Sequence, residues 1–291
     1  ISHEEYTQIA RNFFEQIKPV IPNLKIRASY GSPGNQQVGY YDYIQTISTG
    51  GTINYSFGDG QKASSASVSS PNASDLTWEV VATKNFGIDM SLFDGKLDFT
   101  GDIYTRSTTG MLTAGKDLPS VYGAAIPKIN SADLRTDGWE ITLAWRDKFT
   151  LKSKPFNYTA RFILSDYIST ITKFDNPSKM LNNYYEGQRL GEIWGYVIDG
   201  FFASDEEATN YPVNQTAVND IINSSAGSEK GLKAGDLKFV DLDGDNVIRA
   251  ARSLDDTGDQ KIIGNALPRY SFGLNLDRKS TRLNSSHESP S

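Results

Sequence analysis

The stretch that decides the fold reads Phe86-Gly-Ile-Asp-Met-Ser-Leu-Phe-Asp-Gly-Lys-Leu-Asp-Phe-Thr-Gly-Asp-Ile-Tyr104. Apolar and polar residues alternate strictly on both sides of its central Asp94-Gly95. A period of two sends successive side chains to opposite faces of a strand. Asp-Gly between two such runs is a typical hairpin signal. The stretch therefore predicts two antiparallel strands that share one apolar face and one polar face.

Four more segments of the chain alternate in the same way. They are Leu24–Tyr30, Trp139–Arg146, Asn157–Leu164 and Arg269–Leu276. Six strands with a charged face opposite an apolar face are typical of a membrane β-barrel, because closure of the barrel leaves no unpaired edge in lipid. We expect an all-β fold, part of a transmembrane antiparallel barrel.

The connections between these segments alternate between short and long. The hairpin at Asp94-Gly95 and residues 150–156 are short, whereas 31–75, 110–133 and 176–268 are long. Short turns at one end and long loops at the other are typical of outer-membrane barrels. A loop of about ninety residues is rare in a compact soluble domain. We expect the long loops to be extracellular.

Composition narrows the class of protein without deciding it. No run approaches the roughly 20 apolar residues of a membrane helix, so any membrane span must be a strand. A net charge of −6 and a pI of about 5.1 argue against nucleic acid as a partner. The 291 residues include no cysteine, which is compatible with an exported protein. Ile1-Ser-His-Glu4 is not a signal peptide, so we expect the sequence to begin inside a longer protein.

One helix is expected, over residues 4–18. Apolar residues recur there at helical spacing, and Pro19 and Pro22 end the pattern. We expect this short N-terminal helix to pack over the barrel rim, with a partner-binding role as the alternative.

The residue inventory argues against an enzyme. The two histidines are His3 and His287, and cysteine is absent, which leaves little for histidine-based or thiol-based catalysis. No glycine-rich phosphate loop is present. We therefore expect no catalytic residues.

Six segments together resemble a known family. They are Leu24–Gln36, Leu76–Glu79, Leu118–Gly123, Gly138–Glu140, Ile193–Phe202 and Ile263–Gly273. In order and spacing they resemble the C-terminal barrel of the SusC/RagA family of TonB-dependent outer-membrane transporters.

The resemblance implies a barrel of about 22 strands in the outer membrane of a Gram-negative bacterium. Such a protein imports large nutrients, mostly oligosaccharides and sometimes peptides. A SusD-like lipoprotein acts as its lid, and TonB supplies energy through N-terminal regions. Residues 1–277 would then be a barrel fragment of about six strands, without the plug and the remaining strands. Residues 278–291 break the pattern and are interpreted as a non-native or disordered tail.

An acidic loop, Asp241-Leu-Asp-Gly-Asp-Asn-Val-Ile248, is the clearest candidate metal site. Carboxylates at positions 1, 3 and 5 converge when Gly244 permits a sharp turn, and Val247 can add a backbone carbonyl. Asp255, Asp256 or Asp259 could close the coordination sphere in place of the usual Glu, since that position is Arg252. The predicted calcium ligands are Asp241, Asp243, Asp245, Val247, Asp256 and Asp259. A turn with solvated carboxylates is the alternative. No cofactor is required, and a structural calcium ion is the one metal that the loop suggests.

Aromatic residues gather in the longest connection. They are Tyr184, Tyr185, Trp194, Tyr196, Phe201 and Phe202. Flat rings can stack on sugars while nearby amides and carboxylates bind hydroxyl groups. The same residues could instead pack the loop or contact the lipoprotein lid, and we favour these two roles over sugar contact.

A second function class stays open. A soluble all-β module that binds surface glycans could show the same strands, with the apolar faces forming a core. The two classes differ in what covers the apolar residues.

Overall fold

The computed structural model describes residues 18–35, 44–57, 60–68, 76–115, 121, 126–151, 154–218 and 231–280. The helix expected over residues 4–18 falls almost entirely outside these ranges. So does most of the tail expected over residues 278–291.

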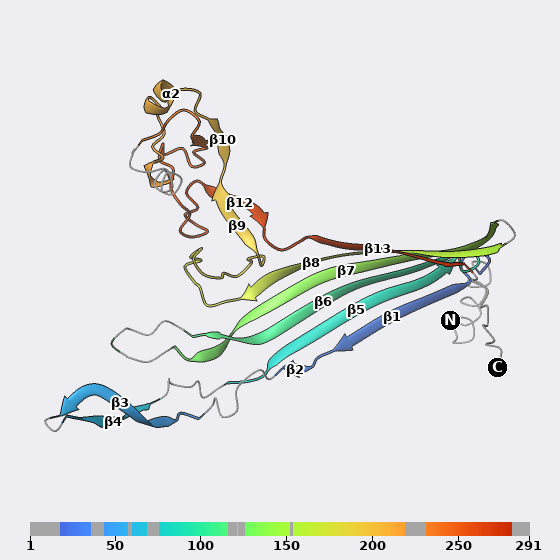
Figure 1. Ribbon diagram of the computed structural model, residues 1–291, viewed down its shortest axis with the longest axis horizontal. Helices are drawn as coiled ribbons and strands as arrows, with labels where there is room; N and C mark the ends of the chain where they lie inside the picture. The colour runs from blue at the N-terminus through green and yellow to red at the C-terminus, as the bar shows by residue number, and fades with distance from the viewer. Residues whose placement is uncertain are drawn as a thin grey trace, which may run out of the picture.

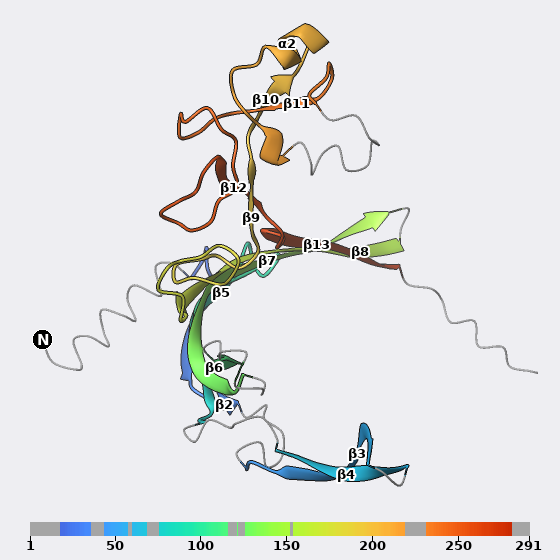
Figure 2. The same cartoon turned by 90° about the vertical axis from the view of Figure 1, so that its left-hand side faces the viewer.

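One curved antiparallel sheet dominates the molecule (Figures 1 and 2). Its strands run in the order β1-β5-β6-β7-β8-β13, with β2 also paired to β5. Their bounds are β1 Asn23–Gly31, β2 Gly34–Asn35, β5 Glu79–Leu92, β6 Leu97–Ala114, β7 Lys128–Leu151, β8 Lys154–Lys173 and β13 Tyr270–Ser280. The sheet does not close within the described residues. The predicted fold class, a partial antiparallel barrel, is confirmed.

The predicted hairpin lies between β5 and β6. Phe93, Asp94 and Gly95 all have positive φ values, of 53°, 54° and 81°. The amide of Gly95 donates to the carbonyl of Leu92 at 3.2 Å, which closes the turn. Opposite strands then pair residue by residue from Leu92 with Leu97 to Val80 with Thr109.

Two strands are longer than their alternating segments. β6 spans 18 residues and β7 spans 24. The connection between them is therefore shorter than the loop expected over residues 110–133, and that expectation was wrong in its extent. A register shift follows Thr108, where Gly110 has a φ of 69° and its amide donates to Asp133 Oδ1 at 2.8 Å. This irregularity breaks the period of two, so the alternation ends before the strands do.

The long connections contain further structure. In the first, β3 (Ile47–Phe57) pairs with β4 (Gln61–Val68). In the longest, which we name the excursion (residues 176–268), two more ribbons form. Its elements are β9 Glu192–Tyr196, β10 Ile198–Phe201, α2 Asp205–Thr209, β11 Leu237–Phe239 and β12 Gln260–Asn265.

The excursion has a small core of its own. Val218, Phe239 and Ile248 are buried together, with Tyr196 packed against them. Gln215 is 1% exposed, and its side-chain amide donates to the carbonyl of Leu237 at 2.8 Å. The excursion is therefore a folded unit.

All long connections leave from the same end of the sheet (Figure 1). The β5–β6 and β7–β8 turns lie at the opposite end. At that end β13 runs to Ser280, with Arg278 opposite Tyr158, so the strand continues three residues past the boundary expected after Asp277.

Candidate functional site

The register assembles continuous apolar rows across the sheet. One row runs through Leu24, Met90, Phe99, Leu143, Phe162 and Leu274, each beside the next. The row above contains Ile26, Ile88, Gly101, Ile141, Leu164 and Phe272, and the row below contains Leu92, Leu97, Trp145, Ala160 and Leu276. We call this side the apolar face.

Nothing in the described residues covers the apolar face. Ile26 is 61% exposed and Phe272 is 76% exposed. Isolated exposed apolar residues are ordinary, but a contiguous patch of this width marks a surface that meets lipid or another protein.

Aromatic residues lie at both borders of the apolar face. Trp139 pairs with Ile103 in the outermost row, towards the long connections. At the other border the indole N–H of Trp145 donates to the hydroxyl of Tyr158 at 3.2 Å. Amphipathic rings at two borders are typical of the girdles of membrane barrels.

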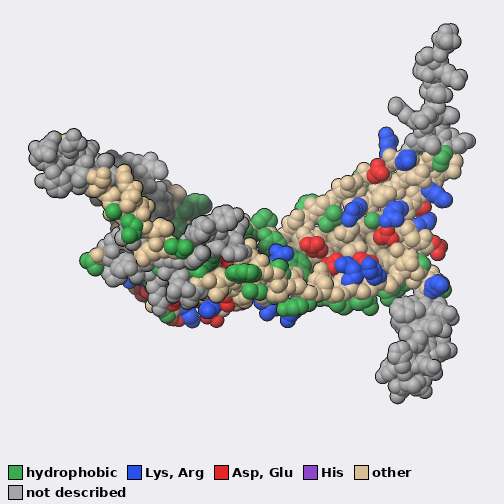
Figure 3. All heavy atoms as spheres, turned by 90° about the horizontal axis from the view of Figure 1, so that it is seen from below, with side chains coloured by type: hydrophobic (Ala, Val, Ile, Leu, Met, Phe, Trp, Pro, Cys, Tyr) green, Lys and Arg blue, Asp and Glu red, His purple; other side chains and the backbone are tan. Residues whose placement is uncertain are grey.

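The opposite side, the polar face, carries a bridged charge cluster. The guanidinium of Arg27 donates to Asp89 at 2.8 and 3.1 Å and to Asp102 at 2.8 and 3.0 Å. Gly87 lies between these residues in the register. A Cβ there would sit 2.7 Å from the Arg27 guanidinium, so only glycine leaves room for the bridge. Figure 3 shows Lys and Arg side chains close to Asp and Glu side chains over the sheet, seen from below.

The excursion is fixed to the outer end of β8. The amide of Ile171 donates to the carbonyl of Gln188 at 2.9 Å, and the amide of Gly187 donates to the carbonyl of Ile171 at 2.8 Å. The amide of Leu190 also donates to the carbonyl of Ser169 in β8, at 2.9 Å. These contacts hold the folded excursion against the end of the sheet.

The six predicted aromatic residues divide into packed and exposed groups. Tyr185 is 4% exposed and donates to Glu192 Oε2 at 2.5 Å, and burial together with this carboxylate raises the pKa of Tyr185 to about 12. Phe202 is 2% exposed and meets Tyr211 edge to face, with 5.1 Å between ring centroids.

Tyr196 packs on Phe239, with ring centroids 5.3 Å apart, and Trp194 is half-buried opposite Ile262. Tyr184 and Phe201 are 52% and 65% exposed. Tyr184 and Phe201 are thus the two members of the set most available to a ligand or a lid.

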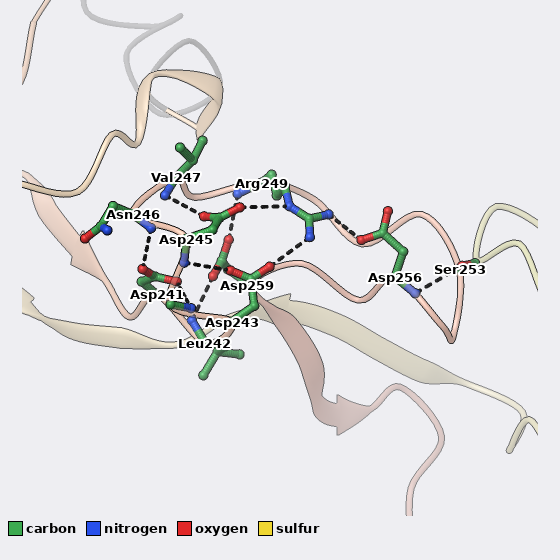
Figure 4. Close-up of polar contacts among 11 residues, drawn as sticks. Asp241, Leu242, Asp243, Asp245, Asn246, Val247, Arg249, Ser253, Asp256 and Asp259 are labelled. Carbon is green, nitrogen blue, oxygen red and sulfur yellow. Dashed lines mark hydrogen bonds and ion pairs between the residues drawn. The ribbon is translucent and has the colours of Figure 1, made fainter.

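The acidic loop folds into successive turns (Figure 4). Asp241 accepts hydrogen bonds from the amides of Gly244 and Asn246, at 2.7 and 2.8 Å. Gly244 and Asn246 have φ values of 79° and 62°, which the tight turns require. The hydrogen bond from the Asn246 amide, followed by that from Gly244, holds the pKa of Asp241 below its ordinary value.

The structure brings together some predicted calcium ligands and not others. Carboxylate oxygens of Asp241, Asp243 and Asp259 lie within 4.8 Å of one another. Asp259 is fully buried and accepts from the amides of Leu242 and Arg249, both at 2.8 Å. Asp256 points away from this group toward Arg249 (Figure 4). Val247 donates its amide to Asp245 at 2.7 Å.

Arg249 is the residue at this loop that the sequence analysis missed. Its guanidinium pairs with Asp243 at 2.8 Å, with Asp245 at 3.5 Å and with Asp256. The pairing with Arg249 lowers the pKa of Asp256. The sequence did hold a signal for this role, because Arg249 follows Asp245 by four residues next to a concentration of carboxylates.

The donor set fits calcium in chemistry, because all its members are oxygens. Arg249 already balances part of the carboxylate charge without an ion. Among the described residues, no helix is both long enough and apolar enough to span a membrane.

Comparison with known proteins gives two sets of relatives. No family model matches the chain. TonB-dependent receptor P39 of Formosa agariphila is 29% identical over 273 residues, which is 86% of this chain and 25% of the receptor. TonB-dependent receptor P3 of the same organism is 26% identical over 92% of this chain. The chain spans about a quarter of the length of the curated relatives it matches.

Two solved structures are similar to this chain in fold. The RagAB peptide transporter matches 92% of this chain with a TM-score of 0.62 at 20% identity. The RagAB peptide importer in its open-open state gives a TM-score of 0.60 at 19% identity. Both cover 26% of the larger chain. These relatives are named as receptors and importers rather than enzymes, consistent with the expectation of no catalytic role.

In its two-faced sheet and its long connections at one end, the chain is thus similar in sequence to a segment of TonB-dependent receptors and similar in fold to a segment of the RagAB transporter.

Proposed function

We propose that this chain forms part of the wall and outer loops of an outer-membrane importer of large nutrients. The observation that carries the proposal is the two-faced sheet, with every long connection at one of its ends. In this assignment the apolar face meets lipid, the polar face lines the lumen, and the excursion is extracellular.

The dimensions of the apolar face support a membrane position. Its four rows extend from Phe86 to Leu92 along β5. At about 3.3 Å per residue they cover about 20 Å along the strand. With a strand tilt of about 40° this is about 15 Å along the membrane normal, which fits within the apolar band of about 25 Å around outer-membrane barrels.

The polar face supports a water-filled lumen. Arg27, Asp89 and Asp102 lie at the depth of the apolar rows but on the opposite side of the sheet. Charged groups are tolerated at that depth only where they pair or meet water. Their bridging satisfies the first condition, and a polar lumen satisfies the second.

The substrate class and the partners are proposed from the family resemblance. The family resemblance supports oligosaccharides or peptides as cargo, a SusD-like lipoprotein as lid and TonB as the energy source. The relatives of known structure are named as transporters of peptides. The exposed rings of Tyr184 and Phe201 are the residues we propose for contact with the lid or the cargo.

We also propose a structural calcium ion at the acidic loop. The spacing of Asp241, Asp243 and Asp245, and the convergence of Asp259 on the first two, support it. The ion would stabilise the excursion and take no part in transport chemistry.

A soluble glycan-binding module remains the competing function. It requires the apolar rows to form a core, yet Leu274 is 66% exposed and Ile103 is 59% exposed. We therefore favour the importer.

Two matched substitutions in the complete transporter test the proposal. Leu143→Arg places a charge on the apolar face and should reduce the free energy of folding in membranes by about 2–4 kcal/mol. Thr142→Arg, on the polar face of the same strand, should change it by less than about 0.5 kcal/mol. Urea titration of the reconstituted barrel, followed by its heat-sensitive gel mobility, measures both. Equal effects, or recovery of the complete protein folded without detergent, would contradict the proposal.

A further inference from the structure

A hollow of about 610 Å³ lies between two rows of side chains near the outer border of the apolar face. The first row contains Phe86, Ile103, Trp139 and Asp166, and the second contains Lys84, Thr105, Asp137 and Ile168. Asn85, Tyr104 and Gly138 lie between the rows along their strands and form its floor. We call this feature the rim hollow.

The rim hollow joins an apolar surface to a charged one. Phe86 and Ile103 are 43% and 59% exposed, and the apolar rows continue from them without a break toward the middle of the sheet. On the other side, Lys84, Asp137 and Arg269 contribute charged groups. A molecule that fills the rim hollow must therefore be apolar at one end and charged at the other.

The charges around the rim hollow leave one cation unbalanced. Asp166 pairs with Arg269 at 2.7 and 3.1 Å. Asp137 pairs with Arg135 at 2.9 Å and accepts from the hydroxyl of Thr105 at 2.6 Å. Lys84 is exposed and makes no ion pair within the part of the chain that the structure describes. The rim hollow thus complements an anion placed beside Lys84.

We propose that the rim hollow binds an anionic, phosphate-bearing membrane lipid. The Lys84 ammonium contacts the phosphate, and the first part of an acyl chain lies against Phe86 and Ile103. A lipid is favoured over free phosphate because the apolar rows continue from the hollow across the sheet. The inference rests on the proposed membrane position of the apolar face.

The test uses the complete transporter, purified and delipidated in maltoside micelles. Binding of phosphatidylglycerol and of phosphatidylcholine is titrated by native mass spectrometry. A single lysine near an anionic lipid contributes about five-fold in affinity. Lys84→Gln should therefore weaken phosphatidylglycerol binding about five-fold, and Lys84→Arg should restore it. Lys25→Gln, which removes the same charge from the polar face, should leave binding unchanged.

The outcomes separate this inference from the proposed function. Equal affinity of the unmodified protein for the two lipids would overturn the site, as would equal losses in Lys84→Gln and Lys25→Gln. The membrane position would still stand in both cases, because the protein is folded in micelles. A complete protein that folds only outside micelles and membranes would overturn both.

Discussion

At the scale of single residues, Gly87 shows how the polar face depends on the absence of a side chain. Its position lets the Arg27 guanidinium reach across β5 to Asp102 on β6. A methyl group there would collide with the Asp102 carboxylate and the Arg27 guanidinium.

Gly87→Ala should therefore destabilise the barrel by about 1–3 kcal/mol, the usual range for overpacking. Gly273→Ala is the control, because Gly273 lies on the same face and a Cβ there meets no atom within 4 Å. Urea titration of both variants measures the difference. Equal stability of the two variants would show that the bridge does not depend on the glycine.

The buried hydroxyl of Tyr185 predicts a pH response at the alkaline end. Its pKa is raised from 10.0 to about 12 by burial and by Glu192. The folded state thus favours the neutral phenol, so its contribution to stability is complete below pH 10 and is lost as the pH rises through 12. Absorbance at 295 nm should show tyrosine ionisation near pH 12, and Tyr185→Phe should reduce its amplitude there by that of one tyrosine. A titration unchanged by the substitution would contradict the assignment.

At the scale of elements, the acidic loop balances its charge with Arg249. The pKa values of Asp241 and Asp256 are lowered, by backbone amides and by Arg249 respectively. The stabilisation is therefore complete above their ordinary value of 3.8 and is lost as the pH falls below it. Amide protection factors over residues 241–259, which correct for the intrinsic slowing of exchange in acid, should be high at pH 7 and fall below about pH 4. Constant protection down to pH 2 would contradict this.

Substitution of Arg249 tests the predicted calcium site. Arg249→Gln leaves Asp243, Asp245 and Asp256 without their cation. In chelator the loop of this variant should lose amide protection, and millimolar Ca²⁺ should restore it. Asp241→Asn in the same background should abolish the rescue. If Ca²⁺ protects neither the unmodified loop nor the variant, the calcium site is contradicted. The loop would then be a turn with solvated carboxylates, the alternative considered from the sequence.

Much of the sheet could be predicted from sequence, because one buried or lipid-facing side imposes a period of two. The pairing of β5 and β6 across Asp94-Gly95 is the clearest example. The ends of β6 and β7 could not be predicted, because the irregularity at Gly110 interrupts the period. The sequence also missed the β3–β4 and β9–β12 ribbons, whose register shifts obscure any alternation.

The loop residues show a similar limit. Asp241 and Asp243 were expected to converge from their spacing alone. Asp259 joins them whereas Asp256 turns to Arg249, and this choice depends on the path of the chain between 249 and 259 rather than on residue type. Likewise, the adjacent residues Phe201 and Phe202 differ in exposure, because Phe201 lies on the surface of the excursion and Phe202 lies inside it.

At the scale of the whole molecule, the proposed function requires lipid on the apolar face of the sheet and water on the polar face. The excursion and the β3–β4 ribbon both extend from the end of the sheet that carries the long connections (Figure 1). The six strands leave β1 and β13 as edges, whose unpaired backbone groups need neighbouring strands. The curated relatives are about four times as long as this chain, which leaves room for such strands.

The most direct test is cysteine scanning along β6 and β7 of the complete transporter in lipid vesicles. This chain contains no cysteine, so each introduced, spin-labelled cysteine reports one position once any cysteine elsewhere in the complete protein has been replaced. The account predicts alternation: labels at 99, 103, 141 and 143 should collide mainly with oxygen, which dissolves in lipid. Labels at 100, 102, 140 and 142 should collide mainly with a water-soluble nickel complex. Accessibility without a period of two, or water exposure at both sets of positions, would contradict the central claim.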